Sequence, residues 1–273
     1  MAVSSLPADT PVLRSVTETR RFATVRSILA LILREMSTSY GRSPGGYIWA
    51  ILEPVAGITL LVGIFSLIAR HPPLGTNFAI FYATGLVPFM MYMGISAKVA
   101  QALTFSRQLL VYPSVTFVDA IIARFTLEFL TQLLVSYIII SFTLMMFETQ
   151  TALDFTGIAL AYGMLGALAL GIGVMNCFLS TMFPLWTRVW AILNRPLLLV
   201  SGIIFLPENV PEPYREYMLY NPLVHVIGQM RRSFYPYYNA PYVSATYVFG
   251  ISLILVAAGM VFLLRYHRDL LNN

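Results

Sequence analysis

Charged residues are scarce in this sequence: Asp, Glu, Lys and Arg together make up 11% of its 273 residues. A soluble globular domain carries roughly 25%, so an ordinary soluble domain is excluded. Hydrophobic residues make up 58% of the chain, and its mean hydropathy is +0.75. They gather in blocks of about 18 to 30 residues, the length of helix that crosses a hydrocarbon core ~30 Å thick. The composition therefore predicts an all-α polytopic membrane protein.

Residues that bind metals or carry covalent chemistry are also few. Cys177 is the single cysteine, so no internal disulfide can form, and we expect a small buried apolar residue there. The histidines, His71, His225 and His267, include no pair four residues apart that could bind zinc from one helix. The phosphate-binding pattern G-x-x-x-x-G-K-[ST] is absent, so the chain cannot use ATP by that mechanism. We therefore expect no catalytic residue, no metal and no cofactor in this chain.

The first 20 residues also lack the apolar core and small-residue cleavage site of a cleavable signal peptide. Residues 1–13 are polar and small and contain proline, and we expect them to be disordered. The first spanning helix is then expected to serve as its own insertion signal.

Residues 14–40 have the periodicity of a helix with one apolar stripe and arginines beside it. The stripe recurs at three- and four-residue steps through Phe22, Val25, Leu29, Ile32 and Met36. This pattern favours a helix that lies in the headgroup region of a membrane. The alternative is a soluble helix packed on a partner domain. Because the turn-forming residues 43–46 lead directly into a long apolar run, we expect a cytoplasmic interfacial helix and linker over 14–46.

The rest of the chain, 47–273, is predicted to be a transmembrane domain of six helices. Each apolar block is long enough to cross a bilayer, and the third is long enough to tilt. The predicted spans are 47–69, 78–97, 118–147, 155–180, 190–206 and 244–264.

The basic residues of the short connections predict the orientation, because cytoplasmic loops hold the excess of Lys and Arg. With a cytoplasmic N-terminus, the inner segments hold eleven of them: Arg14, Arg20, Arg21, Arg26, Arg34, Arg42, Lys98, Arg107, Arg188, Arg265 and Arg268. The outer segments hold four: Arg70, Arg215, Arg231 and Arg232. Both termini are therefore predicted to be cytoplasmic. The basic pI near 9.4 is then explained by the Lys and Arg residues of the cytoplasmic segments. We therefore expect no nucleic-acid partner.

Two connections are too long to be simple turns. In Lys98–Phe117, which would be cytoplasmic, a short amphipathic helix is predicted over about 99–112 and ends at Tyr112-Pro113. The outer connection, 207–243, holds two short apolar helical pieces broken by prolines. Neither piece can span a bilayer, so we expect a re-entrant pair buried by protein in the outer leaflet.

Charged residues within spans are functional candidates because they are costly there. Four residues are such candidates, either for pairing within the membrane or for gating: Glu53, Arg124, Glu128 and Arg195. Arg124 and Glu128 are four residues apart on one helix face, so we expect them to pair, unless Arg124 extends toward the cytoplasm. Glu53 is expected either to pair with Arg124 or Arg195 or to line a pore. Arg195 is also placed where it could extend to the cytoplasmic surface.

The fourth predicted span carries small residues every four positions: Ala159, Gly163, Ala167 and Gly171. Such a ladder permits close approach of a second helix. We expect packing within one subunit rather than a dimer seam.

The outer region is rich in tyrosine. Part of this is explained by the aromatic belt that membrane proteins place at an interface. Tyrosines at a pore mouth would also stack on sugar rings and hydrogen-bond to sugar hydroxyls. The candidates for such a sugar path are Tyr214, Tyr217, Tyr220, Arg231, Arg232, Phe234 and Tyr235.

Three segments carry a resemblance to a known family. Residues 33–55, LREMSTSYGRSPGGYIWAILEPV, resemble the junction of amphipathic helix and first span in permeases of capsular polysaccharide ABC exporters, the KpsM type. Residues 109–129, LLVYPSVTFVDAIIARFTLEF, resemble their second cytoplasmic connection running into the third span. Residues 206–235, LPENVPEPYREYMLYNPLVHVIGQMRRSFY, resemble the outer signature of ABC-2 permeases. The resemblance extends over about 25–268.

This resemblance implies an ABC-2 (type V exporter) fold and a place in the bacterial inner membrane. The functional unit would be a homodimer with two copies of a separate Walker-motif ATPase, which would bind ATP and Mg. The cargo would be a lipid-linked capsular polysaccharide, passed on to periplasmic and outer-membrane export proteins. The re-entrant pair would cap the channel. A coupling helix would dock on the ATPase through Gln101, Phe105, Arg107, Leu109, Leu110 and Tyr112.

Two other classes of function stay open. One is an ABC-2 permease for another cargo, such as O-antigen, teichoic acid or a small hydrophobic drug. The other is a membrane scaffold or membrane-embedded enzyme that works without an ATPase. A coupling helix and a dimer would separate the first class from the second.

Overall fold

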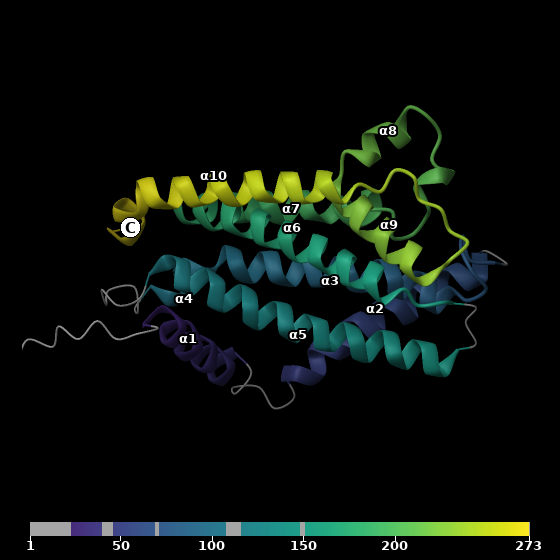
Figure 1. Cartoon of the computed structure of the whole chain (residues 1–273), viewed down its shortest axis with the longest axis horizontal. Coiled ribbons are helices and arrows are strands. Elements are labelled where there is room, and N and C mark those ends of the chain that lie inside the picture. The colour runs from purple at the N-terminus through teal and green to yellow at the C-terminus, as the bar shows by residue number, and fades with distance from the viewer. Residues whose placement is uncertain (1–22, 40–45, 69–70, 108–115, 148–150, 273) are drawn as a thin grey trace, which may run out of the picture.

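The computed structural model describes residues 23–39, 46–68, 71–107, 116–147 and 151–272, and these contain helices and no strand. The all-α prediction is confirmed. The longer helices lie side by side along one axis (Figure 1). The elements are α1 (Ala23–Ser39), α2 (Gly46–Ile68), α3 (Phe78–Ala100), α4 (Ala102–Ser106), α5 (Phe117–Met146), α6 (Phe155–Met182), α7 (Trp186–Val200), η1 (Pro207–Asn209), α8 (Tyr214–Leu219), α9 (Pro222–Phe234) and α10 (Ala245–Asn272).

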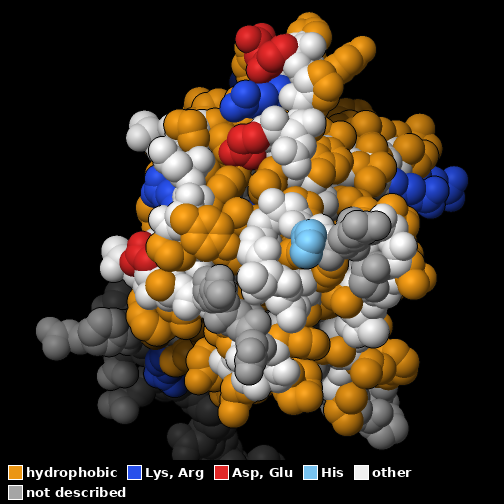
Figure 2. Space-filling model, turned by 90° about the vertical axis from the view of Figure 1, so that its right-hand side faces the viewer, with side chains coloured by type: hydrophobic (Ala, Val, Ile, Leu, Met, Phe, Trp, Pro, Cys, Tyr) orange, Lys and Arg blue, Asp and Glu red, His pale blue; other side chains and the backbone are white. Residues whose placement is uncertain are grey.

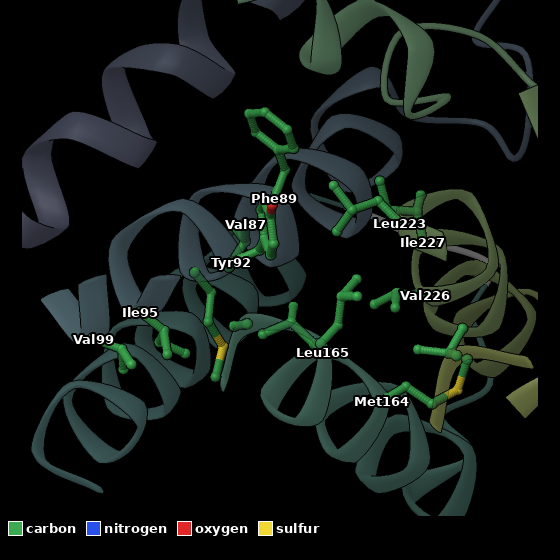
Figure 3. Close-up of a cluster of buried hydrophobic side chains, with 14 of the residues drawn as sticks. Val87, Phe89, Tyr92, Ile95, Val99, Met164, Leu165, Leu223, Val226 and Ile227 are labelled. Atoms are coloured by element: carbon green, nitrogen blue, oxygen red, sulfur yellow. The ribbon is translucent and has the colours of Figure 1, made fainter. Parts of the chain in front are cut away.

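The α3 helix forms the centre of the bundle and packs against α2, α5, α6 and α9. Its side chains are buried on every side; Phe81, Tyr82 and Ile95 are each 0% exposed. Figure 3 shows part of this core, where Val87 and Tyr92 of α3, Leu165 of α6 and Val226 of α9 belong to one apolar cluster. A helix that is apolar all round belongs in the interior, and the sequence of α3 has that character.

Small residues let α6 and α10 pack closely. A Cβ added at Gly171 of α6 would lie 2.8 Å from the backbone oxygen of Ser252 in α10. A Cβ added at Gly259 of α10 would lie 3.0 Å from the backbone nitrogen of Met175 in α6. Since real side chains do not approach backbone atoms so closely, glycine is required at both positions. The expected use of the small-residue ladder within one subunit is confirmed at Gly171.

By length and composition alone, four helices of the described part can cross a membrane: α3, α5, α6 and residues 245–266 of α10. In α2 the search finds a shorter apolar stretch, Val55–Phe65. The α7 helix has 15 residues, which is roughly 22 Å at 1.5 Å per residue. Its bounds correct the expected span 190–206. The helix starts four residues earlier and ends at Val200, because Gly202 takes the left-handed conformation with φ of 73° and turns the chain.

The α1 helix lies against α5. Leu31 and Glu35 face the bundle and are 8% and 6% exposed. A second apolar row points away from the bundle: Val25, Leu29, Leu33 and Met36. That row is the face an interfacial helix presents to lipid. Residues 14–22 of the expected helix lie outside the described residues.

The two long connections each contain the short helices that the sequence predicted. In the first, α4 covers Ala102–Ser106, within the expected 99–112, and residues 108–115 lie outside the described part. In the second, α8 is followed by α9, whose start is capped by the side-chain oxygen of Asn221, with Pro222 at its first position. The α9 helix packs between α3 and α6. These connections therefore define two ends of the bundle, the α4 end and the α9 end (Figure 1).

Candidate functional site

At the α4 end, one arginine joins three elements. Arg124 of α5 is 4% exposed. Its Nε donates to Glu35 Oε1 of α1 at 2.8 Å, and its Nη1 donates to the carbonyl oxygen of Gln101 at 2.9 Å. The guanidinium also lies over the ring of Phe105 in α4, 4.2 Å from the centroid. We call Glu35, Gln101, Phe105 and Arg124 the Arg124 cluster.

In the Arg124 cluster, the buried guanidinium has both an ion-pair partner and a hydrogen-bond acceptor. Gln101 follows the last turn of α3, where carbonyls have no partner within the helix. Arg124 supplies a donor to one of these and an ion-pair partner to Glu35. Removing one member of such a buried pair typically costs about 3–5 kcal/mol, because the other charge is left uncompensated. The cluster therefore fixes α1, α4 and α5 relative to one another.

The start of α5 places Arg124 there. Thr116 and Asp119 form a capping box: Asp119 N donates to Thr116 Oγ1 at 3.2 Å, and Thr116 N donates to Asp119 Oδ2 at 3.0 Å. This fixes where the helix begins, and Arg124 follows about two turns later.

The expected pairing of Arg124 with Glu128 is wrong. The Glu128 carboxylate accepts a hydrogen bond from Gln132 Nε2 at 2.9 Å, and Arg124 pairs with Glu35. The side chain of Arg124 meets α1 and α4, where a carboxylate 89 residues away in the sequence is available. Glu35 was missed from sequence because nothing in a local pattern connects α1 with α5.

Half of the expected docking residues lie in the described part. Gln101, Phe105 and Arg107 are exposed. Phe105 also has the guanidinium of Arg34 5.8 Å from its ring centroid. Leu109, Leu110 and Tyr112 lie outside the described residues.

At the α9 end, Arg231 is buried and joins α9 to the turn after α7. It is 1% exposed, and its Nη1 and Nη2 donate to the carbonyl oxygens of Gly202 and Ile203 at 2.7 and 2.8 Å. Its guanidinium lies 4.1 Å from the ring centroid of Phe81 in α3. The carbonyls at the end of α7 would otherwise lack donors, so Arg231 stabilises the point at which the chain turns.

His225 links the end of α8 to the start of α10. The Ser244 N–H donates to His225 Nδ1 at 3.1 Å, and Nε2 lies 2.8 Å from the carbonyl oxygen of Leu219. Because Nδ1 accepts, the proton of the neutral ring is on Nε2, which donates to Leu219. His225 therefore holds α8 beside α10.

A third set of polar contacts at the α9 end joins Tyr238 to Glu208 and Tyr242. Tyr238 Oη donates to the Glu208 carboxylate at 2.9 Å and lies 3.1 Å from Tyr242 Oη. Burial raises the pKa of the Tyr238 hydroxyl, so it stays a donor to Glu208.

Figure 2 shows this end of the molecule, where hydrophobic side chains cover most of the surface and acidic side chains gather at the top.

The expected sugar-path residues divide into two groups. Tyr214, Tyr217 and Tyr220 are 69%, 70% and 73% exposed and recur at three-residue steps along α8 and its end. Arg232 is also exposed and donates to Gln229 Oε1 at 2.7 Å.

The second group corrects the expectation, because Arg231, Phe234 and Tyr235 are each 1% exposed. They lie in the last turn of α9 and at the residue after it, which pack against the bundle. A polymer cannot touch them in this structure.

Glu53 and Arg195 are exposed, on α2 and α7 respectively. Within the described residues neither forms an ion pair. The expected pairing of Glu53 with Arg124 is wrong, since Arg124 pairs with Glu35. The part of the chain that the structure describes also holds no group of three His, Cys, Asp or Glu side chains placed to bind a metal.

Comparison with known proteins decides the family. A profile described as ABC-2 type transporter matches residues 26–235. The chain belongs to the ABC-2 type transporter family. The resemblance on which the sequence analysis drew is thereby confirmed, and this ABC-2 chain is a multi-pass membrane protein and a transport subunit.

Three curated ABC-2 relatives illustrate what the chain is similar to. It is 34% identical to the polysialic acid transport protein KpsM of Escherichia coli over 234 residues, 86% of this chain and 91% of that protein. It is 25% identical to the capsule polysaccharide export inner-membrane protein CtrC of Neisseria meningitidis serogroup A over 244 residues, 89% and 92% of the two chains. The O-antigen export system permease protein RfbA of Klebsiella pneumoniae is 23% identical over 244 residues, 88% and 92%.

Proposed function

We propose that this chain is the permease subunit of an ATP-driven exporter that moves lipid-linked capsular polysaccharide across the bacterial inner membrane. One observation carries the proposal: the similarity to capsule export proteins extends over 86–89% of this chain and 91–92% of theirs. The similarity therefore extends over most of the bundle, and the family profile itself matches residues 26–235, from within α1 to just after α9.

The proposed assembly is a homodimer with two copies of a Walker-motif ATPase. The ATPase binds ATP and Mg, since this chain lacks the phosphate-binding pattern. The bundle of one chain has a packed centre, so a polymer-wide channel requires a second copy. A closed twofold pairing supplies it. Periplasmic and outer-membrane proteins then receive the polymer.

In the proposed topology six helices span the membrane, namely α2, α3, α5, α6, α7 and α10, and both termini are cytoplasmic. The distribution of basic residues supports this orientation. The α9 end then faces the periplasm, and α8 and α9 form the re-entrant pair. Burial of α9 between α3 and α6 supports that placement, because short helices within a bilayer must be covered by protein.

The proposed coupling element is α4 with its flanking residues. Its docking surface would comprise Gln101, Phe105, Arg107, Leu109, Leu110 and Tyr112. ATP-driven closure of the partner pushes α4, and the Arg124 cluster carries the displacement to α1 and α5. A packed, hydrogen-bonded connection of this kind moves as a rigid body rather than deforming. No residue of the chain performs covalent chemistry.

The proposed polymer contacts at the outer mouth are Tyr214, Tyr217, Tyr220 and Arg232. Exposed tyrosine rings stack on sugar rings, and their hydroxyls bind sugar hydroxyls. Each contact is weak, so a moving polymer can leave it.

Co-purification tests the assembly. The tagged wild-type chain, extracted in mild detergent, is expected to bring down a Walker-motif ATPase. Leu109→Asp is expected to abolish this, because it places a charge in the docking surface. Arg232→Glu, a charge change at the opposite end, serves as the matched control and is expected to retain the ATPase. Recovery of wild-type chain without any ATPase would contradict the proposal.

The second candidate cargo is O-antigen, which the similarity to RfbA favours over drugs or other small molecules. Complementation separates the two. In a strain that lacks its own capsule permease, expression of this chain with its ATPase is expected to restore capsular polysaccharide at the cell surface. Restoration of O-antigen in a matching permease mutant, with no effect on capsule, would decide for the other cargo.

A further inference from the structure

The end of α6 packs directly against the end of α3 and against α4. A Cβ added at Gly173 of α6 would lie 2.6 Å from the Cβ of Val99, which is near the end of α3. The α4 helix packs on α6, and Leu103 of α4 and Cys177 of α6 belong to one buried apolar cluster. A displacement of α4 is therefore applied to this part of α6 without any flexible segment between them.

Asn176, the residue before Cys177, joins the same part of α6 to α7. Its side chain is buried, with the residue 4% exposed, and its Oδ1 accepts a hydrogen bond from Trp186 Nε1 at 2.9 Å. Trp186 is the first residue of α7, and residues 183–185 are all that separates the two helices. The rings of Trp186 and Trp190 are stacked, with centroids 6.1 Å apart. The hydrogen bond thus fixes the start of α7 against the end of α6.

Asparagine is a poor residue for this position if its role is stability alone. Within the described residues, Asn176 Nδ2 is buried and has no hydrogen-bond partner. Burial of an amide group with an unmade hydrogen bond costs free energy, which an apolar side chain would avoid. A buried polar group that stays unsatisfied calls for an explanation. The bond to Trp186 supplies one, because no apolar side chain could make it.

The α7 helix is held by hydrogen bonds at its two ends. At the α4 end, Trp186 donates to Asn176. At the α9 end, Arg231 donates to the carbonyl oxygens of Gly202 and Ile203, just after the helix. Between these points α7 has no buried residue. Because side-chain packing holds α7 only weakly along its length, a displacement of the bundle reaches α7 through its ends.

We propose that Asn176 is a positioning residue of transport, whose hydrogen bond with Trp186 passes a displacement of α4 on to the start of α7. The inference rests on the proposed function, in which an ATPase pushes α4. The path leads from Leu103 of α4 across the end of α6 to Trp186. Packed and hydrogen-bonded segments of this kind move together as a rigid body. Since Asn176 is buried, it acts through Trp186 and not by contact with the polymer.

Two substitutions remove the hydrogen bond from opposite sides. Trp186→Phe retains an aromatic ring beside Trp190 and removes the N–H donor, and Asn176→Leu retains a branched side chain and removes the acceptor. Each variant is purified with its ATPase. The complexes are expected to hydrolyse ATP with the kcat and KM of the wild type, while surface polysaccharide falls several-fold at equal protein level in the membrane. Trp190→Phe makes the same chemical change one turn along α7 and is expected to retain export.

The double variant decides whether the two residues act through one contact. Trp186→Phe with Asn176→Leu removes a hydrogen bond that either single substitution has already removed. Export is therefore expected to fall no further than in the single variants. Losses that multiply in the double variant would show two independent effects and would overturn the proposal.

Unfolding temperatures separate positioning from a purely structural role. Asn176→Leu removes a buried unpaired N–H group, so it is expected to unfold at the wild-type temperature or above. A lower unfolding temperature, with ATP hydrolysis and export lost together, would overturn the proposal. Full export by either single variant would overturn it as well. Recovery of the wild type without any ATPase would instead contradict the proposed function, and the inference would fall with it.

Discussion

Arg124 is the residue on which the α4 end of the bundle depends. Its guanidinium satisfies a carboxylate from α1, a carbonyl at the end of α3 and the face of a phenylalanine in α4. Three segments thus converge on one side chain of α5. Arginine suits this position because its planar group offers several donors in fixed directions and stacks on an aromatic ring, which lysine cannot reproduce. At the other end Arg231 has a similar role, with two carbonyls and Phe81 as its partners.

Replacement of Arg124 by methionine is expected to destabilise the protein by about 3–5 kcal/mol, because the buried Glu35 carboxylate loses the guanidinium with which it forms an ion pair. The double variant Arg124→Met with Glu35→Gln removes both charges and is expected to recover a large part of that loss. Thermal unfolding in detergent is measured for the wild type, Arg124→Met, Glu35→Gln and the double variant, which together form a double-mutant cycle. Equal and additive losses from the two substitutions would show that the ion pair contributes nothing.

At the scale of elements, α6 and α10 share the most extensive contact between helices in the described part of the chain, and glycine makes their approach possible. Gly171 and Gly259 each face backbone atoms of the other helix. Helices in a membrane gain little from hydrophobic burial against one another, so close van der Waals packing has to supply the attraction. In contrast, α7 touches the bundle weakly and has no buried side chain. The difference separates helices that build the bundle from a helix whose surface stays available for the second copy of the proposed homodimer.

A pair of glycine substitutions tests this packing. Gly171→Ala places a methyl group 2.8 Å from the Ser252 backbone oxygen, and overpacking of this kind costs about 1–3 kcal/mol. Gly250→Ala on α10 has nothing within 4 Å of the added methyl group and is expected to be neutral or stabilising by up to about 1 kcal/mol. The two unfolding temperatures are compared in one detergent. If both variants behave alike, helix propensity rather than close packing governs the two positions.

At the scale of the whole molecule, the two ends of the bundle differ in the contacts that hold them together and in the side chains that they expose. The α4 end presents a short helix tied to two longer ones by buried charge. At the α9 end, hydrogen bonds of Arg231, His225 and Tyr238 hold the elements together, and a row of tyrosines is exposed on α8 and at its end. Between the ends, the centre of a single bundle is filled with apolar side chains (Figure 3). The proposed exporter therefore takes its polymer channel from the contact between two copies of the chain.

The tyrosine row gives a prediction about transport. Tyr217 is 70% exposed, so Tyr217→Ala is expected to leave the unfolding temperature unchanged while lowering surface polysaccharide several-fold through loss of stacking, which is worth roughly 0.5–1.5 kcal/mol. Tyr217→Phe retains the ring and is expected to retain most of the export. The amount of polymer at the cell surface is measured at equal protein level in the membrane. Full export by Tyr217→Ala would show that the exposed tyrosines of α8 do not contact the polymer during transport.

The sequence alone determined where the helices are and what kind of protein they form. Apolar blocks, prolines and caps are local signals, so α3, α5 and α6 start within a residue of the predicted positions. The shortened α7 was missed because the turn at Gly202 depends on N–H groups that Arg231 of α9 donates to the carbonyl oxygens of Gly202 and Ile203. Tertiary structure alone decided which charges meet. Arg124 binds a carboxylate 89 residues away rather than one four residues away, and Arg231 is buried rather than exposed. Such choices depend on the packing of distant helices, and a local pattern has no access to them.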